Sequence, residues 1–383
     1  MSHFIYADHA ATTAVSDTAL QAMLPHFTTA YGNPSSLYRF AQEGKTDLER
    51  ARAEIAACLN ARPEEIYFTS GGTEADNWAL RGVAELMALK GRKGGHIITS
   101  AIEHSAVLEP IRALAAQGYE VTYLPVDGRG LVDPAALEGA IRPDTILISI
   151  MAANNETGVV QPIRELAAAA HAAGALFHTD AIQGYLHIPL DVTELGVDAM
   201  TVAAHKIGGP VASGALYLKN RTPLRPRIFG GGQEAGRRAG TQDLRTQLAF
   251  AAAARTLTPH VAEECEKLQA LSDKLYATLT AHPRIHATMG DYAHADRLPG
   301  MVSIYIDGMD SEELIIKLDA AGFEVSAGSA CSSGSMDPSH VLSAMGIGRE
   351  QALGALRISF DDRVIPDDLN DFASALLSIV GAA

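Results

Sequence analysis

The sequence predicts an α/β fold with a mostly parallel sheet, followed by a smaller α+β part. Three features of the 383-residue chain support this fold: its length, an alternation of short β-rich runs with helical patterns between residues 65 and 218, and a change of pattern beyond His282. At roughly 150 residues per domain, the length predicts two or three domains and a large buried core. Disordered chains and small disulfide scaffolds are therefore excluded.

The predicted strands of the first part are short apolar runs that alternate with helices. They cover residues 66–69, 97–99, 121–124, 146–150, 176–179, 200–203 and 215–218. Asp133-Pro134 and Gln161-Pro162 mark helix starts, and Gly174 marks a helix end. Such an alternation is typical of a seven-stranded sheet covered by helices.

The second part begins after a long helical region. A helical pattern runs from about Leu244 to Thr280 with an interruption at Pro259, and it predicts a bridge between domains. Beyond it we expect strands at 302–306 and 355–359 and helices at 311–321 and 367–379. We therefore expect a large domain over 14–258 and a small domain formed by 1–13 with 259–383.

Composition and charge narrow the class of protein. The chain carries 30 basic and 45 acidic residues, a net charge of −15, so no direct nucleic-acid binding is expected. No apolar run approaches the 18 or so residues of a membrane span, and the first residues carry no export signal. Three cysteines cannot all pair, which suits a reducing compartment. We expect a cytoplasmic enzyme that acts on a small molecule.

A glycine-rich segment between a strand and a helix is a candidate phosphate site. Gly71, Gly72 and Thr73 follow the strand at 66–69 and precede a helical pattern. Backbone N–H groups and the helix dipole favour an anion at such a helix start. The pattern Thr73-x-x-Asp76 also predicts a capping box. An ordinary glycine turn before a capped helix explains this segment equally well.

Two charged residues stand at the ends of predicted strands, where ligands of α/β sheets collect. Asp180 follows the strand at 176–179 and could pair with a pyridinium nitrogen. Lys206 follows the next strand and could form a Schiff base with an aldehyde cofactor. Taken singly, each has a simpler explanation: Asp180 as a helix or turn cap, Lys206 as a solvated lysine.

The order of phosphate site, strand-end Asp and strand-end Lys resembles that of pyridoxal-phosphate enzymes of fold type I. Further motifs make the resemblance close: YADHAATT at 6–13, GNPSS at 32–36, EH at 103–104, NNETG at 154–158, GGGQE at 230–234, RAGT at 238–241 and SAGSACSS at 326–333. Together they resemble the NifS/IscS-type cysteine desulfurases of the class V aminotransferase group. The resemblance covers almost the whole chain, from about residue 5 to residue 360.

The resemblance implies pyridoxal 5'-phosphate as the cofactor and assigns residues around it. Lys206 would be the Schiff-base lysine, Asp180 the partner of the pyridine nitrogen, and Gln183 a donor near the phenolic oxygen. His104 would stack on the ring and shuttle protons. As a simpler alternative, it is a solvated loop histidine.

Further contacts follow from the same resemblance. Gly72, Thr73 and His205 would contact the phosphate or nearby cofactor atoms, and Thr241 would come from a second subunit. A homodimer with shared active sites is thereby implied. On the substrate side the resemblance places Asn155, Arg357 and Asn33, and a guanidinium is well suited to hold a carboxylate. No metal site is expected.

Cys331 is the residue on which the predicted activity depends. It lies in a loop of small residues that we expect to be mobile, whereas Cys58 and Cys265 lie in helical surroundings and are interpreted as structural. The implied reaction converts L-cysteine to L-alanine. The Cys331 thiolate takes the sulfur as a persulfide, which then passes to a sulfur-acceptor protein.

Some features leave alternatives open. Ala203 stands where many family members have a serine near the phosphate, which puts one hydrogen bond in doubt. The segment after Arg357 is shorter than in members that dock a cluster scaffold, so the acceptor could belong to iron–sulfur cluster assembly or to another thiolation pathway. Rival functions are another class V aminotransferase, a selenocysteine lyase, or a non-catalytic sulfur-carrier partner. Transamination needs no second nucleophile, so Cys331 argues against the first.

Overall fold

The computed structural model describes residues 4–91, 94–327 and 338–382. Its main sheet is mixed and has the order β2-β8-β7-β6-β5-β3-β4. Within this sheet β8 runs antiparallel to both of its neighbours, and the other pairs are parallel. The strands are β2 (Ile66–Thr69), β3 (His96–Ser100), β4 (Glu120–Leu124), β5 (Thr145–Ser149), β6 (Leu176–Asp180), β7 (Ala199–Ala203) and β8 (Gly214–Leu218). All seven predicted strands are confirmed, with ends shifted by at most one residue.

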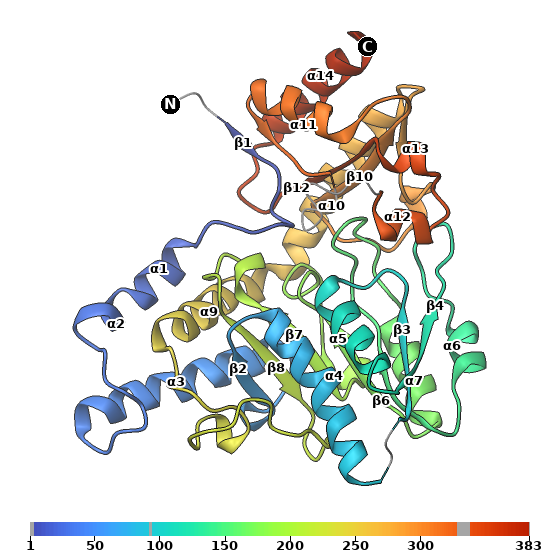
Figure 1. Cartoon of the computed structure of the whole chain (residues 1–383). Helices are drawn as coiled ribbons and strands as arrows, with labels where there is room; N and C mark the ends of the chain where they lie inside the picture. The colour runs from blue at the N-terminus through green and yellow to red at the C-terminus, as the bar shows by residue number, and fades with distance from the viewer. Residues whose placement is uncertain (1–3, 92–93, 328–337, 383) are drawn as a thin grey trace.

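Helices pack on both faces of this sheet (Figure 1). The helices of this part are α1 (Asp17–Met23), α2 (Pro25–Thr28), α3 (Arg39–Cys58), α4 (Gly72–Leu89), α5 (Ser105–Ala115), α6 (Pro134–Ala140), α7 (Ile163–Ala172), α8 (Val192–Leu195) and α9 (Leu244–Leu257). The predicted caps are confirmed: the Asp133 carboxylate accepts the Ala135 N–H at the start of α6, and Gly174 adopts a left-handed φ of 74° after α7.

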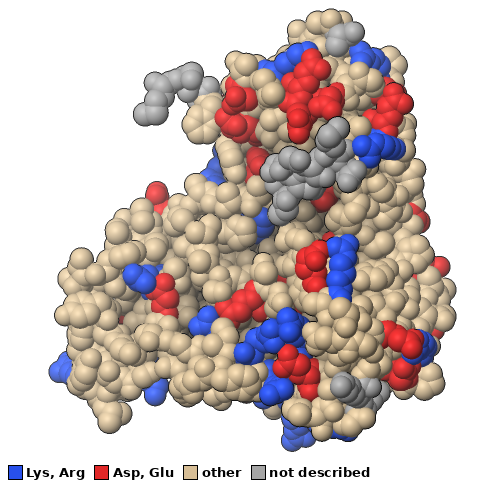
Figure 2. Space-filling view, viewed as in Figure 1, with Lys and Arg blue, Asp and Glu red and all other residues tan. Residues whose placement is uncertain are grey.

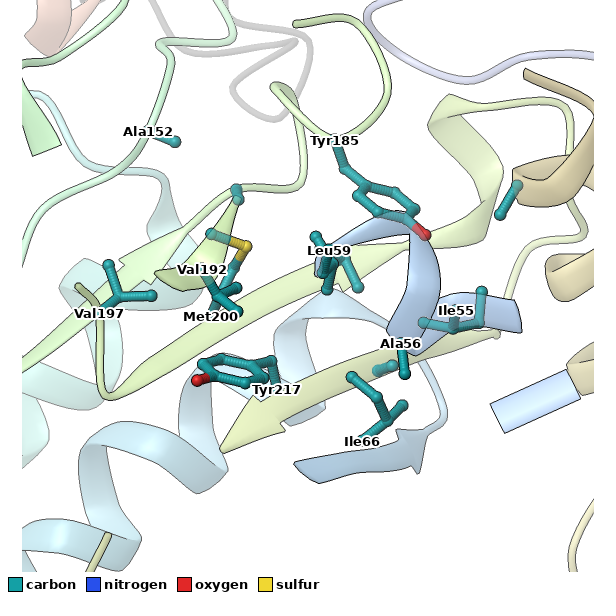
Figure 3. Packing of buried hydrophobic residues seen from close by; sticks show 14 of the residues in the cluster. Ile55, Ala56, Leu59, Ile66, Ala152, Tyr185, Val192, Val197, Met200 and Tyr217 are labelled. Carbon is teal, nitrogen blue, oxygen red and sulfur yellow. The ribbon is translucent and has the colours of Figure 1, made fainter. Parts of the chain in front are cut away.

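One large apolar core fills the space between α3, α9 and the sheet. Figure 3 shows Ile55, Ala56 and Leu59 of α3 beside Met200 and Tyr217 of the sheet. These side chains are at most 4% exposed. Burial of this apolar area is the main force that holds the helices against the sheet. The packed sheet in turn holds the strand ends, and the polar residues at them, in fixed positions.

A second sheet and a second core lie in the remaining part of the chain, at the top of Figure 1. A three-stranded antiparallel sheet has the order β12-β10-β9, and β1 pairs in parallel with β11. The elements are β1 (Ile5–Tyr6), α10 (Val261–Thr280), β9 (Ile285–Ala287), β10 (Met301–Ile306), α11 (Ser311–Ala320), β11 (Phe323–Glu324), α12 (His340–Ala344), α13 (Arg349–Ala352), β12 (Ala355–Ser359) and α14 (Pro366–Ala382). The predicted α+β pattern is confirmed. No helix among the described residues is long and apolar enough to cross a membrane.

The helical bridge has the predicted interruption. α9 ends at Leu257, a short 3-10 turn spans Thr258–His260, and α10 starts at Val261. Pro259 lies in this turn because proline has no N–H to continue the helical hydrogen bonds. The N-terminal strand β1 pairs with β11 in the second part of the chain. Residues 7–13 therefore run from there to the carboxyl ends of β6 and β7, where Ala10 and Ala11 contact Lys206.

Candidate active site

A cavity of about 600 Å³ collects most of the predicted site residues. It lies at the carboxyl ends of β6 and β7 and receives side chains from both parts of the chain. The predicted residues that line it are Gly72, Thr73, His104, Asn155, Asp180, Gln183, His205, Lys206 and Arg357. A larger hollow of about 750 Å³ lies against α3 and residues 232–242, and none of these nine residues lines it. We therefore place the site in the smaller cavity.

Lys206 ends a short 3-10 turn directly after β7. Its Nζ donates hydrogen bonds to the carbonyl oxygens of Ala10 at 2.6 Å and Ala11 at 2.8 Å. The neighbouring His205 is in contact with the Thr12 hydroxyl at 3.3 Å, and burial, with the charge of Lys206, lowers the pKa of His205 to about 4. A neutral His205 at pH 7 can accept as well as donate a hydrogen bond.

Asp180 is the last residue of β6 and is 4% exposed. Its Oδ1 accepts the backbone N–H of Ile182 at 2.9 Å, which fixes the carboxylate relative to the turn. Burial raises the pKa of Asp180, and the charges of His104 and Lys206 oppose this rise. A buried carboxylate at a cavity wall favours a cationic partner, and a protonated ring nitrogen is such a partner.

The predicted phosphate site is the start of α4. Gly71 precedes the helix with a φ of 143°, a backbone conformation that side chains disfavour, and the helix begins at Gly72. A Cβ on Gly72 would lie 2.0 Å from Cδ1 of Ile182 and 3.8 Å from Cβ of Ala203. The missing side chain therefore lets the start of α4 lie close to Ile182 and to the end of β7.

The predicted capping box at this helix is wrong. Thr73 lies inside the first turn, because α4 begins one residue earlier and Gly71 is its N-cap. Asp76 is completely buried, with Oδ1 3.6 Å from Nε2 of His178 on β6. Its carboxyl group thus faces the sheet and does not cap the helix.

His104 caps α5 through its ring. Its Nδ1 accepts the backbone N–H of Ala106 at 3.1 Å. Because an accepting nitrogen carries no proton, the proton of a neutral His104 ring lies on Nε2. This hydrogen bond fixes the ring at the cavity wall. The geometry therefore favours a role for His104 in the cavity over the alternative of a solvated loop histidine.

Arg357 of β12 is held by groups from two distant segments. Its Nη1 donates to the Asn155 carbonyl oxygen at 2.8 Å, and its Nη2 lies 2.6 Å from Oδ1 of Asp8. The side chain is 2% exposed, so the guanidinium is fixed at the cavity wall. We gave no role to Asp8 from the sequence, although it lies inside the motif at 6–13.

Two further buried carboxyl groups lie beneath the cavity, and sequence reasoning gave them no place in it. Burial raises the pKa of Asp76 well above its usual value, and the charge of Asp180 raises it further. Burial raises the pKa of Glu103 to about 8, although Ser100 and the N–H of Met151 donate to its carboxylate. Only the three-dimensional structure could have revealed them, because the sequence pattern does not show how deeply these segments are buried.

Two predicted residues that the structure describes are not brought to this cavity. Asn33 is exposed, and its Oδ1 accepts the N–H of Ser35 at 3.0 Å. Thr241 is exposed as well, outside the cavity of its own chain. Cys331 and its loop, including the expected mobility, lie outside the described residues.

The other two cysteines lie in packed surroundings. The Thr258 hydroxyl is 2.9 Å from Sγ of Cys58, and Cys265 donates to the His187 carbonyl oxygen at 3.0 Å. Burial raises the pKa of both thiols, which disfavours the reactive thiolate. Their geometry supports a structural role.

Comparisons with known proteins agree with this site. The chain matches the aminotransferase class-V family over residues 5–372. It is 43% identical to the cysteine desulfurase IscS of Dictyoglomus turgidum over 380 residues, 99% of this chain and 95% of that protein. Among solved structures, a NifS-like protein matches with a TM-score of 0.91 at 34% identity, over 99% of this chain and 100% of that one. SspA in complex with cysteine matches with a TM-score of 0.81 at 32% identity, over 94% and 99%. The chain belongs to the aminotransferase class-V family, with the fold of its NifS-like members.

Proposed function

We propose that the protein is a pyridoxal-phosphate-dependent cysteine desulfurase, which converts L-cysteine to L-alanine and holds the sulfur as a persulfide on Cys331. One observation carries the proposal: Lys206, Asp180, the start of α4 and Arg357, from four distant segments, meet at one cavity. The resemblance to proteins named cysteine desulfurase over nearly the full chain supports the reaction.

The residues present fit pyridoxal phosphate. The N–H groups at the start of α4 would hold the phosphate, Asp180 the ring nitrogen, and Lys206 the aldehyde carbon. Gln183 is buried, and its Oε1 has no partner among the described residues, as expected for an amide at a ligand site. When bound, the cofactor supplies an electron sink for charge that develops on the substrate.

The protein's own residues would perform the other tasks. Arg357 would bind the substrate carboxylate through its guanidinium, and Asp8 with the Asn155 carbonyl holds that group in place. Lys206 would remove the proton from Cα of the substrate, since its amine lies at the cavity and is held by two carbonyl oxygens. His104, with its proton on Nε2, would hold the ring and exchange protons.

The sulfur step belongs to Cys331. Its thiolate would attack the substrate sulfur, so that an S–S bond forms as the C–S bond breaks and the electron pair stays on the carbon fragment that becomes alanine. This step needs L-cysteine in the cavity, and the similar SspA is solved in complex with cysteine. The sulfur would then pass to an acceptor protein of an iron–sulfur assembly or other thiolation pathway.

We also propose a homodimer with shared active sites. The large apolar side chains exposed between residues 20 and 38 support it: Leu20, Leu24, Phe27, Tyr31, Leu37 and Tyr38. Figure 2 shows few charged side chains over α1 and α2, although the chain is acidic overall. In this dimer Thr241 would reach the partner's cavity.

Two further expectations stand as parts of the proposal. The division into a large domain, 14–258, and a small domain, 1–13 with 259–383, is supported by the separate apolar cores of the two sheets. The cytoplasm is the proposed compartment, where reduced thiols such as those of Cys58 and Cys265 persist.

The test is alanine formation from L-cysteine by the purified protein with pyridoxal phosphate and a thiol reductant. Wild type should form alanine, and Cys331→Ala should not, while Cys58→Ala should remain active because Cys58 lies away from the cavity. Full activity of Cys331→Ala would favour a lyase or aminotransferase that needs no second thiol. A colourless wild type that binds no pyridoxal phosphate would refute the proposal in favour of a non-catalytic partner.

A further inference from the structure

A buried ion pair holds the segment of residues 228–242, here named the anchored loop. The two terminal guanidinium nitrogens of Arg52 on α3 bind the Glu234 carboxylate, Nη1 to Oε2 at 2.6 Å and Nη2 to Oε1 at 3.0 Å. The Arg52 and Glu234 side chains are 8% and 1% exposed. The same carboxylate accepts the Phe68 N–H at 2.9 Å and the Gln242 amide at 2.7 Å. The buried Glu234 carboxylate thus accepts hydrogen bonds from Arg52, Phe68 and Gln242 on both of its oxygens.

The backbone at this carboxylate is strained. Glu234 and Ala235 have φ values of 46° and 54°, the left-handed region that residues with a Cβ disfavour. Such a conformation persists only where the surrounding structure enforces it, and it is often found where a segment has a function. Three glycines directly before it, Gly230 to Gly232, would otherwise leave this segment free to move.

A second ion pair anchors the loop beyond the strained turn. Arg238 Nε lies 2.8 Å from Oε1 of Glu74, and Nη2 lies 3.0 Å from Oε2. Glu74 is in the first turn of α4, and its Oε2 also accepts the Ser70 N–H at 2.7 Å. The loop is therefore fixed at the strained turn to α3 and β2, and beyond the turn to α4. In Figure 1 it is the yellow segment below β2.

The anchored loop carries Thr241, which is exposed and does not line the cavity of its own chain. A residue that must reach a second copy needs a rigid support, because ordering it during binding would cost affinity. A buried ion pair contributes little net stability compared with apolar packing, but it fixes one arrangement of the groups around it.

We propose that Arg52 and Glu234 are positioning residues, which hold the strained loop so that Thr241 is presented to the cavity of a second copy of the chain. The inference rests on the homodimer of the proposed function. Neither residue lines the cavity of its own chain, so both act through the loop. Arg238 and Glu74 support the same arrangement from the other side.

The first experiment measures pyridoxal-phosphate binding to the apo dimer by equilibrium dialysis. Arg52→Met alone would leave the Glu234 charge buried and unpaired, which endangers folding. The double variant Arg52→Met/Glu234→Met avoids this. Its dissociation constant for the cofactor should rise at least 10-fold, with the dimer intact in sedimentation. Arg50→Met, which removes an exposed ion pair from the same helix, should change the constant less than twofold.

A rescue variant tests the role of strain. Adding Ala235→Gly to the double variant should restore at least a third of the lost affinity, because glycine adopts a positive φ without penalty. A purely structural loss of packing would not respond to this change. Absence of rescue, a dissociation constant within twofold of wild type, or a monomeric double variant would each overturn the proposal.

Mixed dimers show which cavity the loop serves. One subunit carries Lys206→Ala, so only the other can react, and the cofactor concentration for half-maximal alanine formation is measured. The double substitution should raise this concentration at least 10-fold when it is in the Lys206→Ala chain and less than twofold when it is in the reactive chain. The reverse pattern would overturn the proposal. Failure of wild type to form alanine would instead contradict the proposed function, and the dialysis result would still decide the role of the loop.

Discussion

Asp180 and Asp76 are buried aspartates close enough to influence each other's charge, but only Asp180 lines the cavity. Asp180→Asn should lower alanine formation by about 100-fold, because a charge-assisted hydrogen bond to the ring nitrogen is worth about 1.5–3 kcal/mol. Asp76→Asn should stay within about threefold of wild type, since burial raises the pKa of Asp76 and so favours its neutral form, which the amide resembles. Initial rates at saturating cofactor check both variants. An equal loss in both would show that Asp76 works as an anion.

Glu103 gives a pH dependence of stability. Its pKa rises from 4.5 to about 8 on folding, so between these values the folded protein holds a proton that the unfolded chain has released. Stability therefore falls as pH rises through this window, by a few kcal/mol at most. Glu103→Gln should reduce the fall in Tm between pH 5.5 and pH 8, measured by thermal unfolding. Glu138→Gln, on an exposed position of α6, serves as the control and should keep the wild-type pH dependence. An unchanged slope in Glu103→Gln would contradict the assignment.

Among the elements, the start of α4 and the turn after β7 form one side of the cavity. Ala203 ends β7, and its Cβ is 3.8 Å from the place where a Gly72 side chain would begin. Ala203→Ser would add a hydroxyl beside the predicted phosphate site, and one added hydrogen bond to an anion is worth about 1–2 kcal/mol. The dissociation constant for pyridoxal phosphate should fall about 5- to 30-fold in equilibrium dialysis. Ala199→Ser, at the opposite end of the same strand, should give no gain. Weaker binding in Ala203→Ser would indicate steric conflict.

The elements themselves were largely predictable, because apolar runs with β-branched residues and helix caps are local signals. The antiparallel direction of β8 was not, since nothing local tells whether 204–213 reverses the chain. The capping box predicted at Thr73 was wrong, because the helix starts earlier and Gly71 is its N-cap. Asp8 and Arg357 meet only because β1 joins the second sheet region, a long-range pairing without a local pattern. The glycine-rich segment and the strand ends indicated Gly72, Thr73, Asp180 and Lys206. Resemblance supplied the other site residues, and burial alone revealed Asp76 and Glu103.

At the scale of the whole molecule, several large apolar side chains are exposed together in the segment of residues 20–38, and they lead to the last prediction. Burying exposed leucine and aromatic side chains against a second copy would favour association by about 25 cal/mol per Å², and a charge placed there would oppose it. Leu24→Asp/Phe27→Asp should therefore shift the protein to monomers in sedimentation at micromolar concentration. Alanine formation should fall at least 10-fold, because Thr241 would no longer reach a partner. Ile316→Asp, at an even more exposed apolar residue on α11, should leave the dimer and the rate unchanged. A fully active monomer would show that each chain completes its own site, and Thr241 would then have no role in the reaction.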